Sequence, residues 1–167
     1  MGGMRTLALA LALMAGLGTA LAEEARRGPE TDLPLPRFVS MKAAEGYARR
    51  GPSSTHRIDW VFTRRNMPLL LVDEYGQWRR VEDREGAGGW MHYSLLSGNR
   101  SVIVEEDGIT LHRRPDPAAP PTARVQAGVV AWLGRCVPGW CDLEAGGAEG
   151  WAPTAALWGV AEGEVRD

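Results

Sequence analysis

The stretch Gly76-Gln77-Trp78-Arg79-Arg80-Val81 decides the fold, because it recurs about sixty residues later as Pro138-Gly139-Trp140-Cys141-Asp142-Leu143. Three further pairs of segments match in the same order and at nearly the same spacing. These pairs are Ala48-Arg49-Arg50-Gly51-Pro52 with Leu111-His112-Arg113-Arg114-Pro115, Met67 to Leu71 with Ala127 to Ala131, and Gly89-Trp90-Met91-His92 with Gly150-Trp151-Ala152-Pro153. Ordered matches of this kind indicate an internal duplication.

Each unit of the duplication has the pattern of short β-strands. Leu69 to Val72 and Val129 to Leu133 are apolar runs too short for buried helices, and turn residues bound them. Trp78 to Val81 and Trp140 to Leu143 alternate apolar and polar residues, as half-buried strands do. Short strands joined by Gly-rich turns predict an all-β chain of two tandem small barrels.

One segment of the first unit is ambiguous. Met41 to Arg50 is rich in helix-forming residues, and propensity alone favours a short helix. The duplication, however, aligns its end with the strand-like Ile109-Thr110-Leu111. We therefore expect a strand from about Tyr47.

Several of the repeated motifs resemble those of bacterial SH3-like (SH3b-type) domains. Ala48 to Pro52 looks like the opening of such a domain, and Gly89-Trp90-Met91-His92-Tyr93-Ser94-Leu95-Leu96 resembles its close. Cys136 to Cys141 and the ending Leu157-Trp158-Gly159-Val160 are similar to a family of exported bacterial proteins with two such domains. The resemblance implies a five-stranded, partly open SH3-like barrel in residues 39–98 and another in residues 99–161, before a tail of residues 162–167.

The resemblance implies peptidoglycan as the partner class, by analogy only. Eukaryotic SH3 domains bind Pro-rich peptides with a Pro followed three residues later by a groove Tyr. The corresponding positions here are His92 and Leu95 in the first repeat, and Pro153 and Ala156 in the second. Recognition of Pro-x-x-Pro ligands is therefore not expected. We expect the two domains to pack on each other, joined by Ser97 to Ser101.

The N-terminal residues predict export. The pattern is that of a signal peptide over residues 1–22: Arg5 is followed by the apolar run Leu7 to Leu17 and by the small-residue site Ala20-Leu21-Ala22. Cleavage is predicted after Ala22. The alternative is a retained membrane anchor. Residues 23–38 are polar and Pro-rich, which predicts a flexible spacer. We expect a periplasmic or secreted protein that is not integral to the membrane after cleavage.

Charge and export together exclude several partner classes. The chain has 19 basic and 21 acidic side chains, so its net charge of −2 gives no general attraction to polyanions. We therefore expect no nucleic-acid partner. Arg49, Arg50, Arg57, Arg64 and Arg65 form a local basic group, which is either a ligand face or an ordinary solvated surface.

The two cysteines, Cys136 and Cys141, bracket the turn Val137-Pro138-Gly139. In an exported chain this arrangement predicts a structural disulfide across a hairpin, and the alternative is a redox-active pair. The three histidines, His56, His92 and His112, lack metal-ligand spacing, so we expect neither a metal nor another cofactor. No catalytic residue is assigned, and the chain is not expected to be an enzyme.

The tryptophans suggest where a ligand would bind. Trp90 and Trp151 follow Gly turns and are expected to fill the barrel cores. Trp78 opens a strand after a turn, as does Trp140, at the position where SH3 relatives display a groove Trp. Our candidate ligand-binding residues are Tyr75, Trp78, Arg79 and Tyr93. The sequence thus predicts a non-catalytic periplasmic binding module for peptidoglycan or cell-wall peptides; the alternative is an envelope protein-interaction scaffold without glycan contact.

Overall fold

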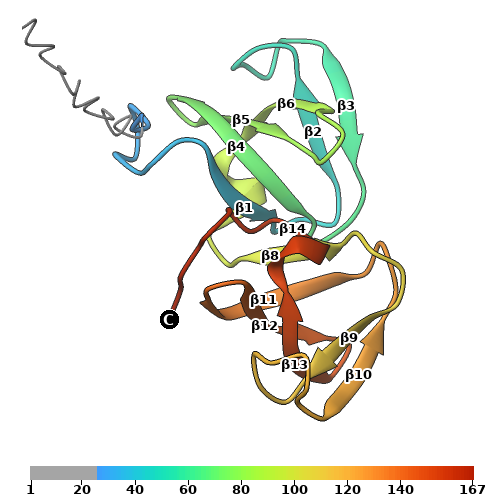
Figure 1. Cartoon of the computed structure of the whole chain (residues 1–167). Helices are drawn as coiled ribbons and strands as arrows, with labels where there is room; N and C mark the ends of the chain where they lie inside the picture. The colour runs from blue at the N-terminus through green and yellow to red at the C-terminus, as the bar shows by residue number, and fades with distance from the viewer. Residues whose placement is uncertain (1–25) are drawn as a thin grey trace, which may run out of the picture.

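The computed structural model describes residues 26–167, which form two β-barrels in succession (Figure 1). The predicted signal peptide and its cleavage site lie outside the described residues. Each barrel has seven strands and one 3-10 turn. The elements of the first barrel are β1 (Arg37–Met41), β2 (Gly46–Arg49), β3 (Ile58–Phe62), β4 (Pro68–Tyr75), β5 (Trp78–Glu82), β6 (Gly88–His92), η1 (Tyr93–Leu95) and β7 (Leu96–Ser97).

The second barrel repeats these elements in the same sequence. They are β8 (Ser101–Val104), β9 (Ile109–His112), β10 (Pro121–Val125), β11 (Val130–Val137), β12 (Trp140–Ala145), β13 (Ala148–Pro153), η2 (Thr154–Ala156) and β14 (Leu157–Trp158). The strand order is β3-β2-β6-β5-β4-β1-β7 in one sheet and β10-β9-β13-β12-β11-β8-β14 in the other. The two orders correspond strand by strand. The prediction of an all-β chain with two tandem small barrels is therefore confirmed.

A long hairpin forms the centre of each barrel. Tyr75 pairs with Trp78 across the turn of β4 and β5, and Val137 pairs with Trp140 across the turn of β11 and β12. Each two-residue turn contains a glycine with positive φ, a conformation that costs glycine least. The repeated Trp therefore starts the returning strand in both barrels.

Each barrel encloses its own apolar core. Met41, Leu69, Val81 and Met91 are fully buried in the first barrel. The second core has the same kind of composition and includes Val102, Leu111, Leu143, Ala152 and both cysteines. Inward and outward residues alternate along the strands, as the pleat requires.

The expectation that Trp90 fills a core is wrong, whereas Trp151 is buried as expected but does not belong to the main core cluster of its barrel. The core residues are their neighbours, Met91 and Ala152, and adjacent residues of a strand face opposite sides of the sheet. Trp90 is half-buried, and Trp151 is buried beneath the Arg135 guanidinium, whose Cζ lies 5.3 Å from the ring centroid. Trp90 therefore lies outside the core of the first barrel, on the side of the sheet opposite to Met91.

The strand expected from Tyr47 is present as β2, which begins at Gly46. The helix-forming residues before it form no helix, because Met41 ends β1 and the N–H groups of Lys42 and Ala43 donate to the Leu95 carbonyl oxygen instead of to a helical neighbour. Pairing in the sheet outweighs the local propensity of this segment.

The flexible spacer expected over residues 23–38 is wrong for residues 26–38. Arg27 and Pro34 form an isolated β-bridge, and Leu35 is buried in the core of the first barrel. Composition suggested flexibility because this segment has few apolar residues. The segment is held by polar groups of the barrel instead, as described below. We name residues 26–36 the N-terminal strap.

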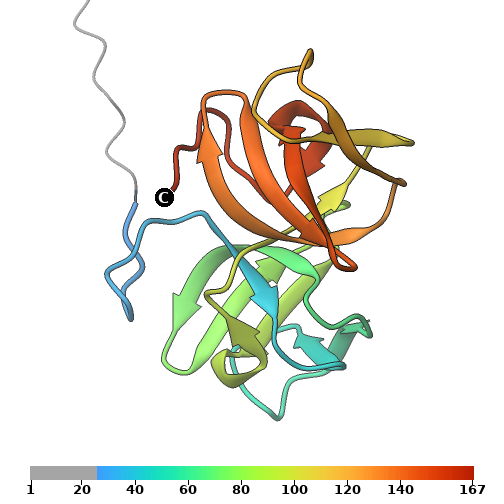
Figure 2. The same cartoon turned by 90° about the horizontal axis from the view of Figure 1, so that it is seen from below.

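The two barrels pack directly on each other (Figures 1 and 2), as expected from the short connection. The Ser101 hydroxyl donates to the Asn66 carbonyl oxygen (2.6 Å). The rings of Phe38 and Trp158 meet edge to face, with their centroids 5.2 Å apart. The Arg100 guanidinium also lies over the Phe38 ring, with its Cζ 5.4 Å from the ring centroid.

The C-terminal residues 162–167 also dock on the protein. Arg100 binds both carboxylate oxygens of Glu164, at 3.0 and 3.1 Å. Burial alone would raise the pKa of Glu164, but hydrogen bonds from Arg100 and the Ala161 N–H, with the Arg100 charge, hold it below its ordinary value. Arg166 then forms a β-bridge with Cys136 of β11.

Candidate functional site

Four ring side chains meet on one face of the first barrel, and we call them the aromatic patch: Tyr75, Trp78, His92 and Tyr93. Trp78 of β5 and His92 of β6 are directly opposite in register, and their rings meet edge to face at 5.8 Å. The Tyr93 ring lies 4.9 Å from His92. Tyr75 and Tyr93 are 64% and 50% exposed, which leaves both rings open to a ligand.

His92 is fixed in place by the start of the 3-10 turn. Its Nδ1 lies 2.8 Å from the Ser94 hydroxyl and accepts from the Ser94 N–H at 3.4 Å. Its Nε2 lies 3.2 Å from Gln77 Oε1. The tight 3-10 turn brings His92 and Ser94 into contact. His92 Nε2 faces the Gln77 side-chain amide rather than the carboxylate that a catalytic histidine would need. The contact of Nδ1 with Ser94 instead caps the start of η1.

Arg79 lies beneath the patch, and only 9% of it is exposed. Its guanidinium donates to the carbonyl oxygens of Gly76 (2.8 Å) and Trp78 (2.9 Å). Its Cζ lies 5.9 Å from the centroid of Tyr93, within the range of a cation–π contact. The four candidate residues from the sequence thus lie together, with Arg79 supporting the aromatic rings from below.

Glu74 joins the patch to the N-terminal strap. Its fully buried carboxylate accepts hydrogen bonds from the Glu30 N–H (3.1 Å), the Thr31 N–H (3.0 Å) and the Thr31 hydroxyl (2.8 Å). Arg37 donates to the same carboxylate at 2.6 Å, and Arg79 Nε lies 3.7 Å away. In return, the Gly76 N–H of the β4–β5 turn donates to the Glu30 carboxylate at 2.8 Å. The strap therefore borders the hairpin that carries Tyr75.

The environment of Glu74 favours its charged form. Burial alone would raise the pKa of Glu74. Hydrogen bonds from Arg37, Thr31 and the Glu30 N–H, together with the positive charge of Arg37, outweigh that effect. The pKa of Glu74 is accordingly lower than the ordinary value for glutamate, and the strap is held by a carboxylate that stays ionised.

The second barrel has a disulfide at the corresponding place. Cys136 pairs with Cys141 in register, as Glu74 pairs with Arg79 in the first barrel. The two cysteines are bonded and buried, with their Cα atoms 4.1 Å apart, which confirms the predicted disulfide. The same cross-strand position thus carries an ion pair in one barrel and a covalent bond in the other.

The second barrel also has a groove at the position equivalent to the aromatic patch. Its volume is about 270 Å³, and Trp140, Pro153, His112, Ala156 and Glu106 contribute to its walls. The His112 and Trp140 rings meet edge to face at 5.8 Å. We did not assign a site here from the sequence. The signal was present in the alignment of Trp140 with Trp78 and of Pro153 with His92.

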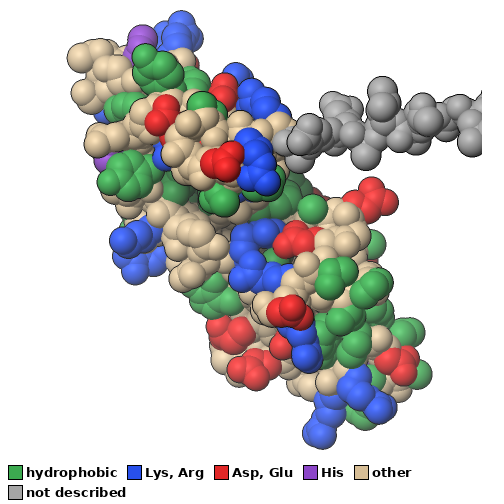
Figure 3. All heavy atoms as spheres, turned by 90° about the vertical axis from the view of Figure 1, so that its left-hand side faces the viewer, with side chains coloured by type: hydrophobic (Ala, Val, Ile, Leu, Met, Phe, Trp, Pro, Cys, Tyr) green, Lys and Arg blue, Asp and Glu red, His purple; other side chains and the backbone are tan. Residues whose placement is uncertain are grey.

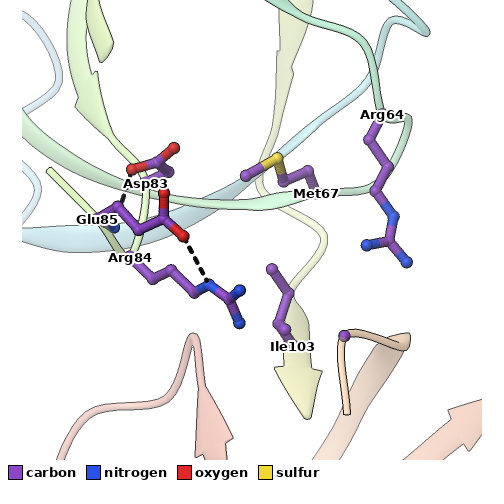
Figure 4. Close-up of a pocket in the computed structure, with 7 residues that line it drawn as sticks. Arg64, Met67, Asp83, Arg84, Glu85 and Ile103 are labelled. Atoms are coloured by element: carbon purple, nitrogen blue, oxygen red, sulfur yellow. Dashed lines mark hydrogen bonds and ion pairs between the residues drawn. The ribbon is translucent and has the colours of Figure 1, made fainter. Parts of the chain in front are cut away.

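A smaller cleft of about 240 Å³ lies between the two barrels (Figure 4). Met67 and Ile103 provide apolar surface, with Arg64 on one side and Arg84 on the other. Two carboxylates also line the cleft, and one of them, Glu85, lies 3.7 Å from Arg84. The balanced charge gives the cleft no preference for an anion or a cation.

The basic group noted in the sequence is partly neutralised. Arg50 and Arg57 both bind the Asp59 carboxylate, at 3.1 and 2.8 Å, and their hydrogen bonds hold the pKa of Asp59 below its ordinary value. Arg49 donates to the His56 carbonyl oxygen. On the face drawn in Figure 3, basic and acidic side chains are interspersed. The ion pairs of Arg50 and Arg57 with Asp59, and the hydrogen bond from Arg49 to a backbone carbonyl, favour an ordinary solvated surface for these three arginines.

Two structural features are absent from residues 26–167. In that part of the chain, no three His, Cys, Asp or Glu side chains are grouped so that they could hold a metal ion. No helix in the same range has the length and apolarity needed to cross a membrane.

Comparison with solved structures gives distant similarities. The structures titled NlpC2 and NlpC1 from Trichomonas vaginalis share 12% and 11% sequence identity with this chain, with TM-scores of 0.35 and 0.34. The matches cover 74% and 78% of this chain, which spans about half of each matched structure (48%). Similarity at this level carries no functional inference. Among curated proteins, none matches the sequence.

The family comparison is specific. The model of the family described as "Bacterial SH3 domain" matches the chain twice, at residues 42–98 and 105–159. Each match covers one barrel, from the end of its first strand to the final short strand after the 3-10 turn. Together the matches span more than half of the sequence, in agreement with the duplication and the strand orders. The chain therefore belongs to the bacterial SH3 domain family and carries two tandem copies of that domain.

Proposed function

We propose that this protein is a non-catalytic binding module of the bacterial cell envelope that recognises peptidoglycan or cell-wall peptides. The observation that carries the proposal is the aromatic patch, in which the His92 ring contacts both Trp78 and Tyr93, and in which Tyr75 and Tyr93 remain exposed. Membership of the bacterial SH3 domain family supports a cell-wall ligand. The signal peptide predicted from the sequence supports a location in the periplasm or outside the cell.

The chemistry of the patch suits a ligand with both apolar and polar groups. Aromatic faces provide large rigid contact surfaces at a low entropic cost, and the Tyr hydroxyls add hydrogen-bonding groups at the rim. Arg79 is buried and already donates to two carbonyl oxygens, so its part is to position Tyr93 rather than to contact the ligand. The binding surface is thus formed by the rings.

The groove of the second barrel offers a second contact on the same ligand. Trp140 and Pro153 provide its apolar surface, and Glu106 and His112 provide polar groups. Two weak sites in one rigid molecule bind a polymeric ligand more tightly than either site alone, because the second contact becomes intramolecular. A polymer such as peptidoglycan presents many copies of the same unit and can occupy both.

Co-sedimentation with purified sacculi tests the proposal. The chain without residues 1–22 should sediment with sacculi, and Trp78→Ala and Tyr93→Ala should each reduce the bound fraction, as should Trp140→Ala. Tyr47→Ala is the matched control, since Tyr47 is an exposed aromatic residue on β2 outside the patch. Absence of sacculus binding by the unsubstituted protein would remove the peptidoglycan proposal.

The absence of catalysis is part of the same proposal. Ser94 and His92 touch, but His92 Nε2 faces Gln77 instead of a carboxylate that would stabilise an imidazolium. Incubation of sacculi with the protein should therefore release no soluble muropeptides. Release that is lost in Ser94→Ala would show that the contact is catalytic.

A second candidate function is a protein-interaction scaffold in the envelope. The observation that favours it is a group of exposed apolar side chains on β3 at the edge of the first sheet. Pull-down from envelope extracts by Trp78→Ala as well as by the unsubstituted protein would support this candidate, because partner binding would then be independent of the aromatic patch.

A further inference from the structure

The strand β3 forms an edge of the first sheet and pairs there only with β2, among the strands of residues 26–167 (Figure 1). Ile58, Trp60 and Val61 of this strand, with Tyr47 of β2 opposite Val61, are between 40% and 45% exposed. An edge strand also presents alternate N–H and C=O groups that no neighbouring strand uses. Exposed apolar side chains thus coincide with exposed backbone hydrogen-bonding groups.

The second barrel shows how the same edge looks when it is protected. Its strand β10 begins with Pro121, which has no N–H, where β3 begins with Ile58. Trp60 and Val61 of β3 correspond to Ala123 and Arg124 of β10. Proline and charged residues are the usual means of protecting an edge strand from pairing. The barrels share one strand order, so the apolar edge is a property of β3 and not a requirement of the fold.

The charges around β3 define the kind of partner. Arg57, near one end, shares Asp59 with Arg50, whereas Arg64 and Arg65 follow the other end and have no carboxylate within 4.0 Å among residues 26–167. An antiparallel pair of two β3 strands would bring Arg57 of one copy towards Arg64 and Arg65 of the other. Like charges would oppose that pairing. An extended segment with acidic residues at its ends has the complementary charge.

We propose that β3 binds an extended peptide segment of another protein by strand addition, and that this segment has alternating apolar residues between acidic ends. Main-chain hydrogen bonds provide the affinity in this mode, and alternate side chains provide the specificity. Val61, Tyr47 and Ile58 would contact one face of the added strand, and Trp60 the other, because a register shift places Ile58 opposite Arg49. This inference takes the second candidate function further, because it names the kind of partner that β3 would bind. It uses β2 and β3 rather than the aromatic patch, so strand addition and peptidoglycan binding can each fail without the other.

The test uses a synthetic peptide with two Glu residues on each side of an alternating Val-Thr core, titrated into the protein by fluorescence anisotropy. We expect binding, and a loss of affinity of about tenfold or more in Val61→Glu, which replaces an apolar contact by a repulsive charge. Arg124→Glu is the matched control at the equivalent position of β10, and it should leave the affinity unchanged. Val61 is exposed, so Val61→Glu should keep its fold, which circular dichroism checks.

Two further probes make the geometry and charge testable. Two peptides should be compared, one N-methylated at the odd residues and one at the even residues. Only one of them should lose binding, because only one of these two sets of N–H groups faces β3. Replacement of the Glu ends by Lys should weaken binding about tenfold or more. Equal binding of the two methylated peptides, equal binding of the Lys peptide, or a concentration-dependent dimer that Val61→Glu disrupts would overturn the proposal.

Discussion

The contacts of Glu74 make Glu74→Gln the most informative single substitution. The native carboxylate accepts hydrogen bonds from two backbone N–H groups, the Thr31 hydroxyl and Arg37, all within a buried site. Glutamine has nearly the same shape but only one acceptor oxygen and no charge. Its amide N–H₂ would face donors, and the mostly buried Arg37 would lose its counter-charge.

The magnitude follows from these contacts. Removing one partner of a buried ion pair costs about 3–5 kcal/mol, because the other charge stays buried without compensation. The retained oxygen offsets part of this cost, so we expect the first barrel to lose about 3 kcal/mol in its free energy of unfolding. For a domain of this size, such a loss lowers Tm on the order of 15 °C.

Urea unfolding followed by Trp fluorescence measures the loss, and hydrogen exchange of the Glu30 and Thr31 amides reports release of the strap. A matched variant combines Glu74→Cys with Arg79→Cys, which copies the second barrel's disulfide into the equivalent register. It should recover stability of the hairpin but leave both strap amides unprotected. A change below about 1 kcal/mol in Glu74→Gln, with both amides still protected, would refute the reasoning.

Three other predictions follow from the same structure. Replacing Cys136 and Cys141 together by Ala should destabilise the second barrel by roughly 2 kcal/mol, because the closed loop is short, and reductant should have the same effect on the native protein in urea unfolding. Glu164→Gln should release residues 162–167 and lower the free energy of unfolding by about 2 kcal/mol, because it breaks a bidentate ion pair with Arg100. Faster hydrogen exchange of the Arg166 amide, which donates to the Cys136 carbonyl, reports this release. Acid should destabilise the protein through Glu74 and Glu164, because the pKa of each is lower in the folded state than its ordinary value. The stability that they contribute is fully present above the ordinary glutamate pKa and is lost as the pH falls through the folded pKa. The urea midpoint of unfolding should therefore decrease in acid, and it should decrease less steeply in Glu74→Gln.

The sequence was sufficient to predict the fold because its signals are local. The Gly turns before Trp78 and Trp140 set the hairpins, and the alternation after them set the strands. The disulfide followed from the same register. The face of Trp90 was mistaken because a shift of one residue along a strand exchanges inside and outside, and apolar residues occupy both sides here.

The candidate site was predicted less completely. Tyr75, Trp78, Arg79 and Tyr93 lie together, yet whether they bind a ligand stays a prediction. The strap was missed because its stability comes from Glu74, and a glutamate in a strand looks like a solvated residue until its burial is known. The groove beside Trp140 was missed because its walls come from segments far apart in the sequence, including Glu106 and Pro153.

The positions of the two docked ends have a mechanical consequence. The strap is fastened to Glu74 of β4, and Arg166 is fastened to Cys136 of β11, which are equivalent positions of the two central hairpins. A pulling force applied between these two ends would act first on the hydrogen bonds that join them to β4 and β11. It would act only afterwards on the pairing of β1 or β14. The first event under force would be the breaking of the few hydrogen bonds at Glu74 or at Cys136, which would lengthen the chain slightly while both barrels stay folded.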